Sequence, residues 1–516
     1  MLSPQIASHP VAEHSLCVFY ELDGIDPAGW TGPRFGNLTR NPGQGIPADQ
    51  KAALQGRYAE DALWEADETL SAGDDFHAHL QELLSGARPD LVRFHRLTER
   101  GHRFLSTACL YEKTTPPADR IAKRLRLSLT SAAKERIAAA GVVPGELGLE
   151  VESLSLALFM TAQGLALCRF VVDREDGAPL SAVELLEATV ALSRLNEVRW
   201  IDKKAKTPIE APAFSMAALI GQMVFGSRSQ AEVSRRLSSH AMVRFDAILP
   251  ITDRDRYALM LARHYTTDYQ LSPDIGRVEW VRDFETVRHA IALEGAATVI
   301  GPTEGAPTLT EFLRNFRTST FDRHYLPIAI LALHERAFLV ARTAASIMSA
   351  AEMLDAQKSL RRLAELREAA LVLRLCYRFS EQSHISMHNA VNLAWRKVLR
   401  LDEMLAELDD SIRDIADHLE RIHRRAQERK FAGVAIMGGA IIAGFSTFSI
   451  VKDLYDLFKA SQTYGWIGVC VGGIALIGVA AFAHRKSAVF GALDQDCSKN
   501  YTVHAMLEKM TRRSKD

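Results

Sequence analysis

The chain has 516 residues, of which 47% are hydrophobic and 24% charged, and its formal net charge is −1. This length suffices for two or three domains, and the balanced charge excludes a protein that binds nucleic acid duplexes through an overall basic field. Six cysteines are scattered without CxxC or Cys/His ligand spacing, so we expect neither a structural zinc site nor a disulfide framework.

The first 325 residues predict an α+β body. The N-terminus lacks a basic segment followed by an apolar run, so no cleaved signal peptide is expected. Residues 92–112 and 154–173 each show two alternating runs around a turn, which is typical of a β-hairpin. A helix is expected over 181–195, with Ser181 as its N-cap and Glu184 in the capping-box position. Further strands are expected over 16–22, 243–251 and 297–300, and further helices over 215–225 and 229–239.

Composition also suggests where the chain divides. Proline-marked stretches at 206–214 and 301–309 are typical of boundaries between subdomains. The predicted divisions are a cytosolic α+β subdomain at 1–205, a second at 206–325, a helical stalk at 326–430, a transmembrane hairpin at 431–486 and a cytosolic tail at 487–516.

The sequence of the predicted body contains few residue patterns that are typical of catalytic or ligand-binding sites. It contains no P-loop, HExxH motif or nucleophile elbow, so we expect a protein that is not an enzyme and has no catalytic residues. Six glycines lie in the loop 23–47 together with Arg34 and Arg40, which suits either a cradle for a phosphate-bearing ligand or a long mobile loop. The basic run that contains Arg120 and Arg124 faces either an anionic ligand or solvent.

Two histidines have the spacing of metal ligands without forming a complete set. His384 and His388 are four residues apart, but no third ligand is near them in the sequence, so no metal site is expected. No cofactor is assigned.

A long helical segment follows the body. No glycine or proline occurs from Ile328 to Ala432, and apolar residues recur at 3-4 spacing from Val391 to Ala426. This repeat is typical of a coiled coil and predicts an unbroken stalk helix over 387–430. The apolar stripe could instead pack on the helices that precede it, and both contacts could hold together.

Two uncharged runs follow, at 431–451 and 460–483. Each exceeds the roughly 20 residues that a helix needs to cross a bilayer, so the pair predicts a transmembrane hairpin, with a hairpin buried in a globular core as the alternative. Cations flank the hairpin at 421–430 and 484–486, which predicts a multi-pass inner-membrane protein with both termini cytoplasmic.

Small residues fall at helical spacing in both runs. Ala435, Gly439 and Ala443 form a stripe in the first run, and Gly468 and Gly472 form a GxxxG pair in the second. Such stripes let helices pack closely, although small residues are also common in membrane helices for other reasons. If these stripes are the surfaces through which the helices of different copies pack, they predict a homo-oligomer.

This layout, over about 326–486, resembles the CorA-type two-span metal channel superfamily. The resemblance implies a pentamer whose first span lines a pore, and hence a lipid bilayer as partner. Unlike that family, the chain lacks Gly-Met-Asn after the first span, which speaks against housekeeping magnesium uptake. Candidate residues of the outer pore mouth are Ser446, Thr447, Ser449, Asp453 and Asp456.

These observations lead to one leading hypothesis. We expect an oligomeric CorA-like ion channel or membrane-permeabilising effector, gated by a body that senses a small anionic or nucleotide signal. CorA-like proteins without the motif also act in bacterial antiviral defence, so the resemblance implies that role too. The alternatives are a non-conducting, membrane-anchored interaction or scaffold protein, and a divergent transporter of divalent metal ions.

Overall fold

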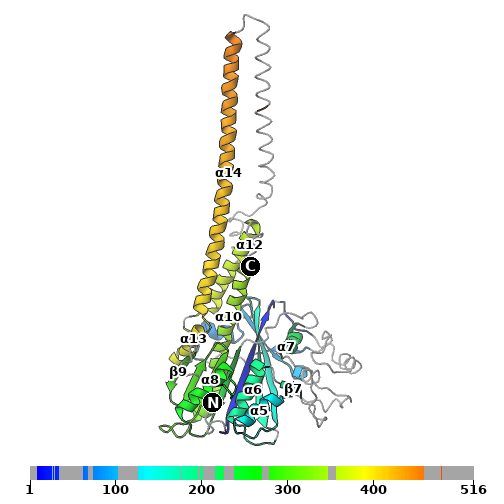
Figure 1. The fold of residues 1–516 in the computed structure, drawn as a ribbon, viewed down its shortest axis with the longest axis vertical. Coiled ribbons are helices and arrows are strands. Elements are labelled where there is room, and N and C mark those ends of the chain that lie inside the picture. Colours follow the sequence, from blue (N-terminus) through cyan, green and yellow to red (C-terminus); the bar gives the residue numbers. More distant parts are fainter. Residues whose placement is uncertain are drawn as a thin grey trace, which may run out of the picture. The chain divides into compact units, whose positions relative to one another are not determined.

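We analysed a computed structural model of the chain (Figure 1). The structure describes residues 8–25, 27, 29–33, 62–67, 74–102, 126–174, 176–195, 198–200, 216–225, 238–269, 278–346, 356–379, 381–457 and 478. The chain forms two compact units, Met1–Arg413 and Asp414–Asp516. We call the first unit the body.

A mixed sheet of eleven strands forms the centre of the described part of the body. The strands are β1 (Glu13–Asp23), β2 (Trp64–Ala66), β3 (Val92–Leu97), β4 (Arg126–Leu129), β5 (Leu147–Phe159), β6 (Gln163–Arg174), β7 (Val198–Trp200), β8 (Ser238–Arg244), β9 (Glu279–Phe284), β10 (Val287–Ile291) and β11 (Gly295–Ile300). Their order is β2-β3-β5-β6-β1-β8-β11-β10-β9, and β4 pairs with β5 and β7. The prediction of an α+β body is confirmed.

Strand pairing joins parts of the chain that the sequence analysis assigned to different subdomains. β1 pairs antiparallel with β6 on one side and with β8 on the other. β8 in turn pairs with β11 in parallel. Strands from both predicted α+β subdomains therefore belong to one sheet.

The hairpin predicted over 154–173 is confirmed by β5 and β6, which pair antiparallel. Ala162 turns the chain with φ of 64°, and Leu158 lies opposite Gly164. A Cβ at Gly164 would lie 2.9 Å from Leu158 Cδ2 and 3.3 Å from the Ala157 carbonyl oxygen, so glycine fits this register without displacing its neighbours. Of the hairpin predicted over 92–112, β3 forms the first strand, and residues 103–112 lie outside the described residues.

One strand and one helix were misplaced by the sequence analysis. The strand predicted over 243–251 is wrong, because β8 ends at Arg244 and the helix α8 (Ile251–Arg263) begins directly after Pro250. Proline has no N–H to pair in a sheet and is well tolerated where a helix begins. The helix predicted over 229–239 ends inside β8, and its earlier residues lie outside the described part of the chain.

The helix α6 (Ala182–Val190) confirms the predicted capping box. The side chain of Ser181 accepts a hydrogen bond from the Glu184 backbone, and the Glu184 carboxylate accepts one from the Ser181 N–H. The same carboxylate also accepts from Arg174 at 2.8 Å. All nine residues of α6 are buried, so these bonds satisfy polar groups that no solvent can reach.

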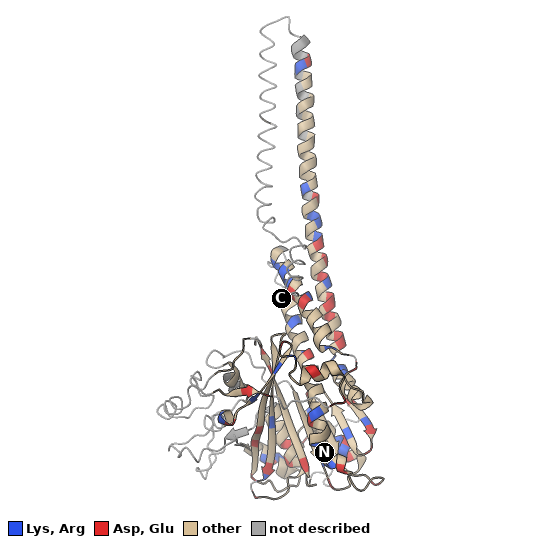
Figure 2. Cartoon of the chain, turned by 180° about the vertical axis from the view of Figure 1, so that it is seen from behind, with Lys and Arg blue, Asp and Glu red and all other residues tan. Residues whose placement is uncertain are grey.

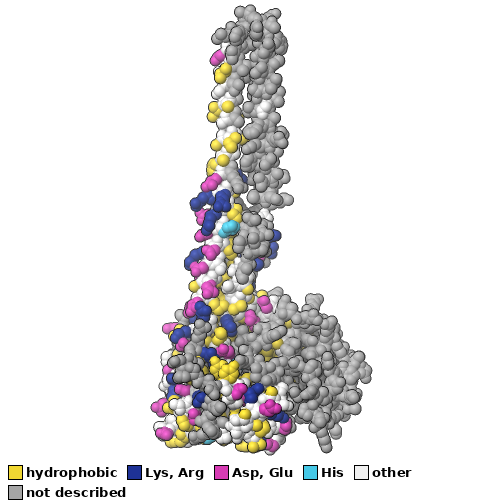
Figure 3. All heavy atoms as spheres, in the orientation of Figure 1, with side chains coloured by type: hydrophobic (Ala, Val, Ile, Leu, Met, Phe, Trp, Pro, Cys, Tyr) yellow, Lys and Arg dark blue, Asp and Glu magenta, His cyan; other side chains and the backbone are white. Residues whose placement is uncertain are grey.

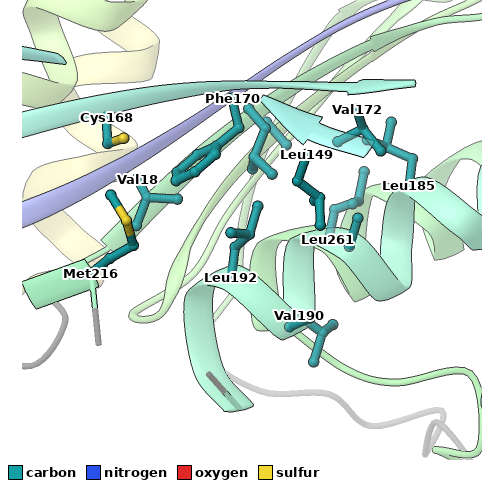
Figure 4. Close-up of a cluster of buried hydrophobic side chains, with 14 of the residues drawn as sticks. Val18, Leu149, Cys168, Phe170, Val172, Leu185, Val190, Leu192, Met216 and Leu261 are labelled. Atoms are coloured by element: carbon teal, nitrogen blue, oxygen red, sulfur yellow. The ribbon is translucent and has the colours of Figure 1, made fainter. Parts of the chain in front are cut away.

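Helices cover both faces of the sheet. The helices α5 (Ser131–Ala139), α6 and α8 lie together over one face (Figure 1). Apolar side chains from strands and helices interlock there, among them Phe170 of β6, Leu185 of α6 and Leu261 of α8 (Figure 4). Alternate residues of β8 divide between the faces: Ala241 and Val243 belong to this core, whereas His240 points to the other side.

The helical segment after the sheet is broken more often than the sequence predicted. Its elements are α9 (Glu311–Arg314), the π-helix η5 (Arg317–Tyr325), α10 (Leu326–Ser346), α12 (Ala356–Val372), the π-helix η6 (Leu373–Tyr377), α13 (Ser386–Val398) and α14 (Leu401–Leu457). An unbroken helix over 387–430 is wrong, because Arg400 has φ of 56°, which no right-handed helix accommodates. Leu401, Leu405 and Leu408 of the predicted apolar stripe are buried.

The predicted transmembrane hairpin is not found. Among the residues that the structure describes, none of the helices combines the length and the apolar character that a membrane span requires. Residues 431–451 are instead part of α14, whose first thirty residues are rich in charge (Figure 2). Four glycines, two serines and a threonine also lie in this stretch, and these residues gain little from hydrocarbon, so the lack of charge alone was a poor guide. The predictions of a membrane hairpin, a channel and an inner-membrane location are therefore wrong. The second run, 460–483, lies outside the described residues.

Candidate functional site

The face of the sheet opposite α6 and α8 carries a group of buried histidines, which we call the histidine cluster: His240, His289, His324 and His388. They come from β8, β10, η5 and α13. All are at most 5% exposed. The helix α13 contributes to this site and also leads into α14, so the site lies where the sheet meets the long helix.

At one end of the cluster, His324 and His388 stack with ring centroids 4.3 Å apart. His324 Nε2 lies 3.2 Å from the Asp75 carboxylate, whose side chain is half exposed. Phe76 packs against both rings. This end of the cluster therefore joins residues 75 and 76 to η5 and α13.

Ser383 sets the tautomer of His388. Its hydroxyl donates to the Asp75 carbonyl oxygen at 2.8 Å and accepts from the Ile385 N–H. Because a hydroxyl has only one hydrogen, His388 Nδ1, at 2.9 Å, must be the donor in its bond to Ser383 Oγ. Neutral His388 thus carries its proton on Nδ1 and presents Nε2 as an acceptor.

At the other end of the cluster, one threonine hydroxyl lies between two histidines. Thr298 Oγ1 is 3.0 Å from His289 Nδ1 and 3.4 Å from His240 Nε2. The His240 ring lies against Trp395 of α13, and the His289 ring lies against Tyr325 of η5. Tyr325 also contacts His388, which connects the two ends through aromatic rings.

Burial keeps these imidazoles neutral at pH 7. It lowers the pKa of His388 to about 4, with the nearby His324 as a second cause. Burial lowers the pKa of His240 and of His289 to about 3. It also lowers the pKa of His324, although Asp75 opposes the shift. Protonation of these imidazoles is therefore unfavourable, because the buried surroundings stabilise a positive charge poorly.

Several polar atoms of this site have no hydrogen-bond partner. They are Nδ1 of His240, Nε2 of His289 and Nε1 of Trp395. A buried polar atom without a partner costs about 1–3 kcal/mol. The packing of α13 and η5 on the sheet is therefore less favourable than a fully satisfied core, which favours rearrangement at this point of the body.

An ion-pair network holds the junction between α13 and α14. Glu335 of α10, which is 4% exposed, lies 3.1 Å from Arg396 of α13 and 3.7 Å from Arg378. Arg396 and Arg378 both also pair with Asp402 in the first turn of α14. Burial raises the pKa of Glu335, and the two arginines oppose this. The network thus ties the start of α14 to α10 across the break at Arg400.

The structure describes some of the site residues predicted from the sequence. Ala435, Gly439 and Ala443 are exposed on α14. Ser446 and Ser449 are exposed too, and Ser446 Oγ donates to the Ile442 carbonyl within the helix. Asp453 is exposed near the helix end. Thr447 and Asp456 also belong to α14.

The remaining predicted residues lie outside the described part of the chain: Arg34, Arg40, Arg120, Arg124, Gly468 and Gly472. Their roles in ligand binding and helix packing stay predictions.

One member of the histidine cluster, His388, was a candidate metal ligand by its spacing in the sequence. The spacing pairs it with His384, but in the structure the partners of His388 are Ser383 and His324. Within the described residues, no group of three or more histidine, cysteine or acidic side chains is placed to hold a metal ion. The alternation of side chains along a strand could have indicated from the sequence that His240 and His289 face the same side of the sheet. Only the pairing of the strands shows that both lie next to the Thr298 hydroxyl.

Comparison of the chain with protein-family models, with curated proteins and with solved structures finds no match. The resemblance to the CorA superfamily stays a prediction.

Proposed function

We propose that this chain is a signal-responsive assembly protein, in which α14 associates with copies of itself and the body changes the position of α14 in response to a signal. The observation that carries the proposal is the row of exposed apolar side chains in the second half of α14 (Figure 3). The row comprises Phe431, Val434, Met437, Ile441, Ile442 and Phe445.

The spacing of these residues favours a second copy of the same helix as the partner. Phe431, Val434, Ile441 and Phe445 occupy the first and fourth positions of successive heptads, and each is more than half exposed. Gly438 takes the heptad position between them, with open space where a Cβ would lie. A copy of α14 presents the same heptads, so two such helices can pack knobs into holes along this row.

The size of the row also supports association. Large contiguous apolar patches are rare on proteins that remain monomers. The charged side chains of α14 lie mainly before residue 431, so the row is not interrupted by charge until Lys452 (Figure 2). The junction at Glu335 and the neighbouring histidine cluster support the other half of the proposal, because a rearrangement there reaches α14 directly.

Sedimentation velocity of the full chain tests the assembly. We expect an oligomer, which the double substitution Ile441→Glu and Phe445→Glu converts to a monomer. The matched control is Ile436→Glu with Ile450→Glu, because these two exposed residues lie on the opposite side of α14 and should leave the oligomer intact.

Two outcomes would contradict the proposal. One is a wild-type chain that sediments as a monomer at every concentration. The other is a monomeric chain that floats with phosphatidylglycerol vesicles and loses this binding on substitution of Ile441 and Phe445, since the row would then serve a lipid surface.

A further inference from the structure

Arg254 lies at the opposite face of the sheet from the histidine cluster. It is completely buried and lies in the second turn of α8. Its Nη1 donates to the Gly301 carbonyl oxygen at 2.8 Å, but its Nε and Nη2 have no hydrogen-bond partner. At least three of the five N–H groups of this guanidinium are therefore unsatisfied.

Arg254 also lacks a carboxylate of its own. In the part of the chain that the structure describes, no ion pair includes Arg254. Asp255, whose charge acts on Arg254, already pairs with Arg288 at 3.4 Å and with Arg282 at 3.2 Å. An arginine does not give up its proton, so a positive charge stays buried. The charges of Asp255 and Glu285 act on it, but neither carboxylate forms an ion pair with Arg254 among the described residues. This cost indicates that an anion belongs there.

The surrounding fold is suited to an anion. β8 and β11 run parallel, and their carboxyl ends lie at the same edge of the sheet, which Phe245 and Ile300 mark by a backbone hydrogen bond. The helix α8 follows β8 after a connection of residues 245–250, so its positive N-terminal end lies at this edge (Figure 1). Helical side chains lean toward the helix N-terminus, and the bond to Gly301 places the Arg254 guanidinium beside the loop that follows β11.

We propose that Arg254 and the N-terminal turn of α8 bind a phosphate group, either free phosphate or the phosphate of a phosphorylated small molecule. Tetrahedral oxyanions match the guanidinium fork and also accept from helix N–H groups. The turn from Gly301 to Ala306 lies against Arg254 through Gly301, so we expect an anion bound at this site to contact this turn. This site goes beyond assembly through α14 and does not depend on it.

Thermal unfolding of the full chain with added inorganic phosphate tests the site. We expect a saturable rise in the melting temperature that chloride at equal ionic strength does not produce. Substitution Arg254→Lys keeps the charge but loses the fork, so it should weaken phosphate binding by about tenfold or more. The control is Arg282→Gln, which removes a half-exposed arginine that pairs with Asp255 and should leave the phosphate affinity nearly unchanged.

A second measurement uses only the wild-type chain, so it remains valid even if the Arg254 variant misfolds. Hydrogen exchange of the wild-type chain should slow in residues 301–306 when phosphate is added. Adenosine monophosphate in place of inorganic phosphate distinguishes the two possible ligands. Tighter binding of the nucleotide than of phosphate assigns the site to a phosphorylated small molecule. Equal or weaker binding of the nucleotide assigns the site to free phosphate. Absence of any saturable effect of either compound on the wild-type chain, or equal loss of binding in the Arg254 and Arg282 variants, would overturn the proposal.

Discussion

His324 and His388 stack at 4.3 Å although they belong to different elements, η5 and α13, and although both can carry a positive charge. The contact is favourable only while both rings are neutral, because two imidazolium rings at this distance repel each other. Of the groups around the pair that the structure describes, Asp75 alone carries an opposing negative charge, and its side chain is half exposed.

The first prediction concerns pH. The pKa of His388 is about 4 in the folded chain and near 6.5 when unfolded, so the unfolded chain binds more protons between these values. Stability should therefore be full above about pH 6.5 and fall as the pH drops toward 4, by up to about 3 kcal/mol from this group alone. Urea unfolding at a series of pH values measures the loss.

Two variants test the assignment to His388. His388→Gln should make this pH dependence shallower, because one of the groups that take up a proton on unfolding is gone. His423→Gln, an exposed position on α14, should leave the curve as in the wild type. A curve of unchanged slope in the His388 variant would refute the assignment.

The second prediction concerns the ion pairs at the start of α14. Arg396→Met leaves the buried Glu335 with only the longer contact to Arg378, so we expect a loss of about 3 kcal/mol in the free energy of unfolding. The double variant Arg396→Met with Glu335→Gln should regain part of it, since the uncompensated charge is removed.

Arg413→Met is the matched control for this pair. Arg413 and its partner Asp410 are both mostly exposed, so its removal should change stability by less than about 0.5 kcal/mol. Equal losses of unfolding free energy in the Arg396 and Arg413 variants would show that the ion pairs at the start of α14 stabilise the fold no more than an exposed ion pair does.

The third prediction concerns the buried capping box. Ser181→Ala removes the side chain that caps α6 and a donor to the Glu184 carboxylate, so we expect a loss of about 2 kcal/mol in chemical denaturation. Thr310→Ala removes the same kind of cap from α9, which buries none of its residues, and should cost about 0.5 kcal/mol. A larger loss of unfolding free energy for Thr310→Ala than for Ser181→Ala would contradict the claim that burial makes the cap at Ser181 more important.

The fourth prediction concerns the approach of β11 to β8. A Cβ at Gly295 would lie 2.6 Å from the Ser239 carbonyl oxygen, so Gly295→Ala should cost about 2 kcal/mol or more, because backbone in a central strand cannot easily move. At Gly305 the nearest atom, in the Glu285 side chain, is 3.5 Å away, and alanine should be tolerated within about 0.5 kcal/mol. Equal melting temperatures of the two variants would contradict this packing.

Local signals in the sequence were sufficient for several elements. The Ser181 and Glu184 pair identified the start of α6, and the turn at Ala162 identified the hairpin of β5 and β6. These elements depend on contacts between residues near each other in the chain, which a sequence window contains. The same reasoning failed at 243–251, where Pro250 marks a helix start that the apolar pattern concealed.

The sequence by itself determined the α+β character of the body and the helical nature of the segment after it, because both follow from periodicity and from glycine and proline placement. Only the tertiary structure decided where α13 and α14 divide. Arg400 adopts its left-handed conformation there, and Arg396 before the break pairs both with Glu335 of the distant helix α10 and with Asp402 after the break. The histidine cluster and the unsatisfied Arg254 were likewise decided by strand pairing and burial. Whether a polar side chain has a partner depends on groups far away in the chain, and a sequence window does not contain them.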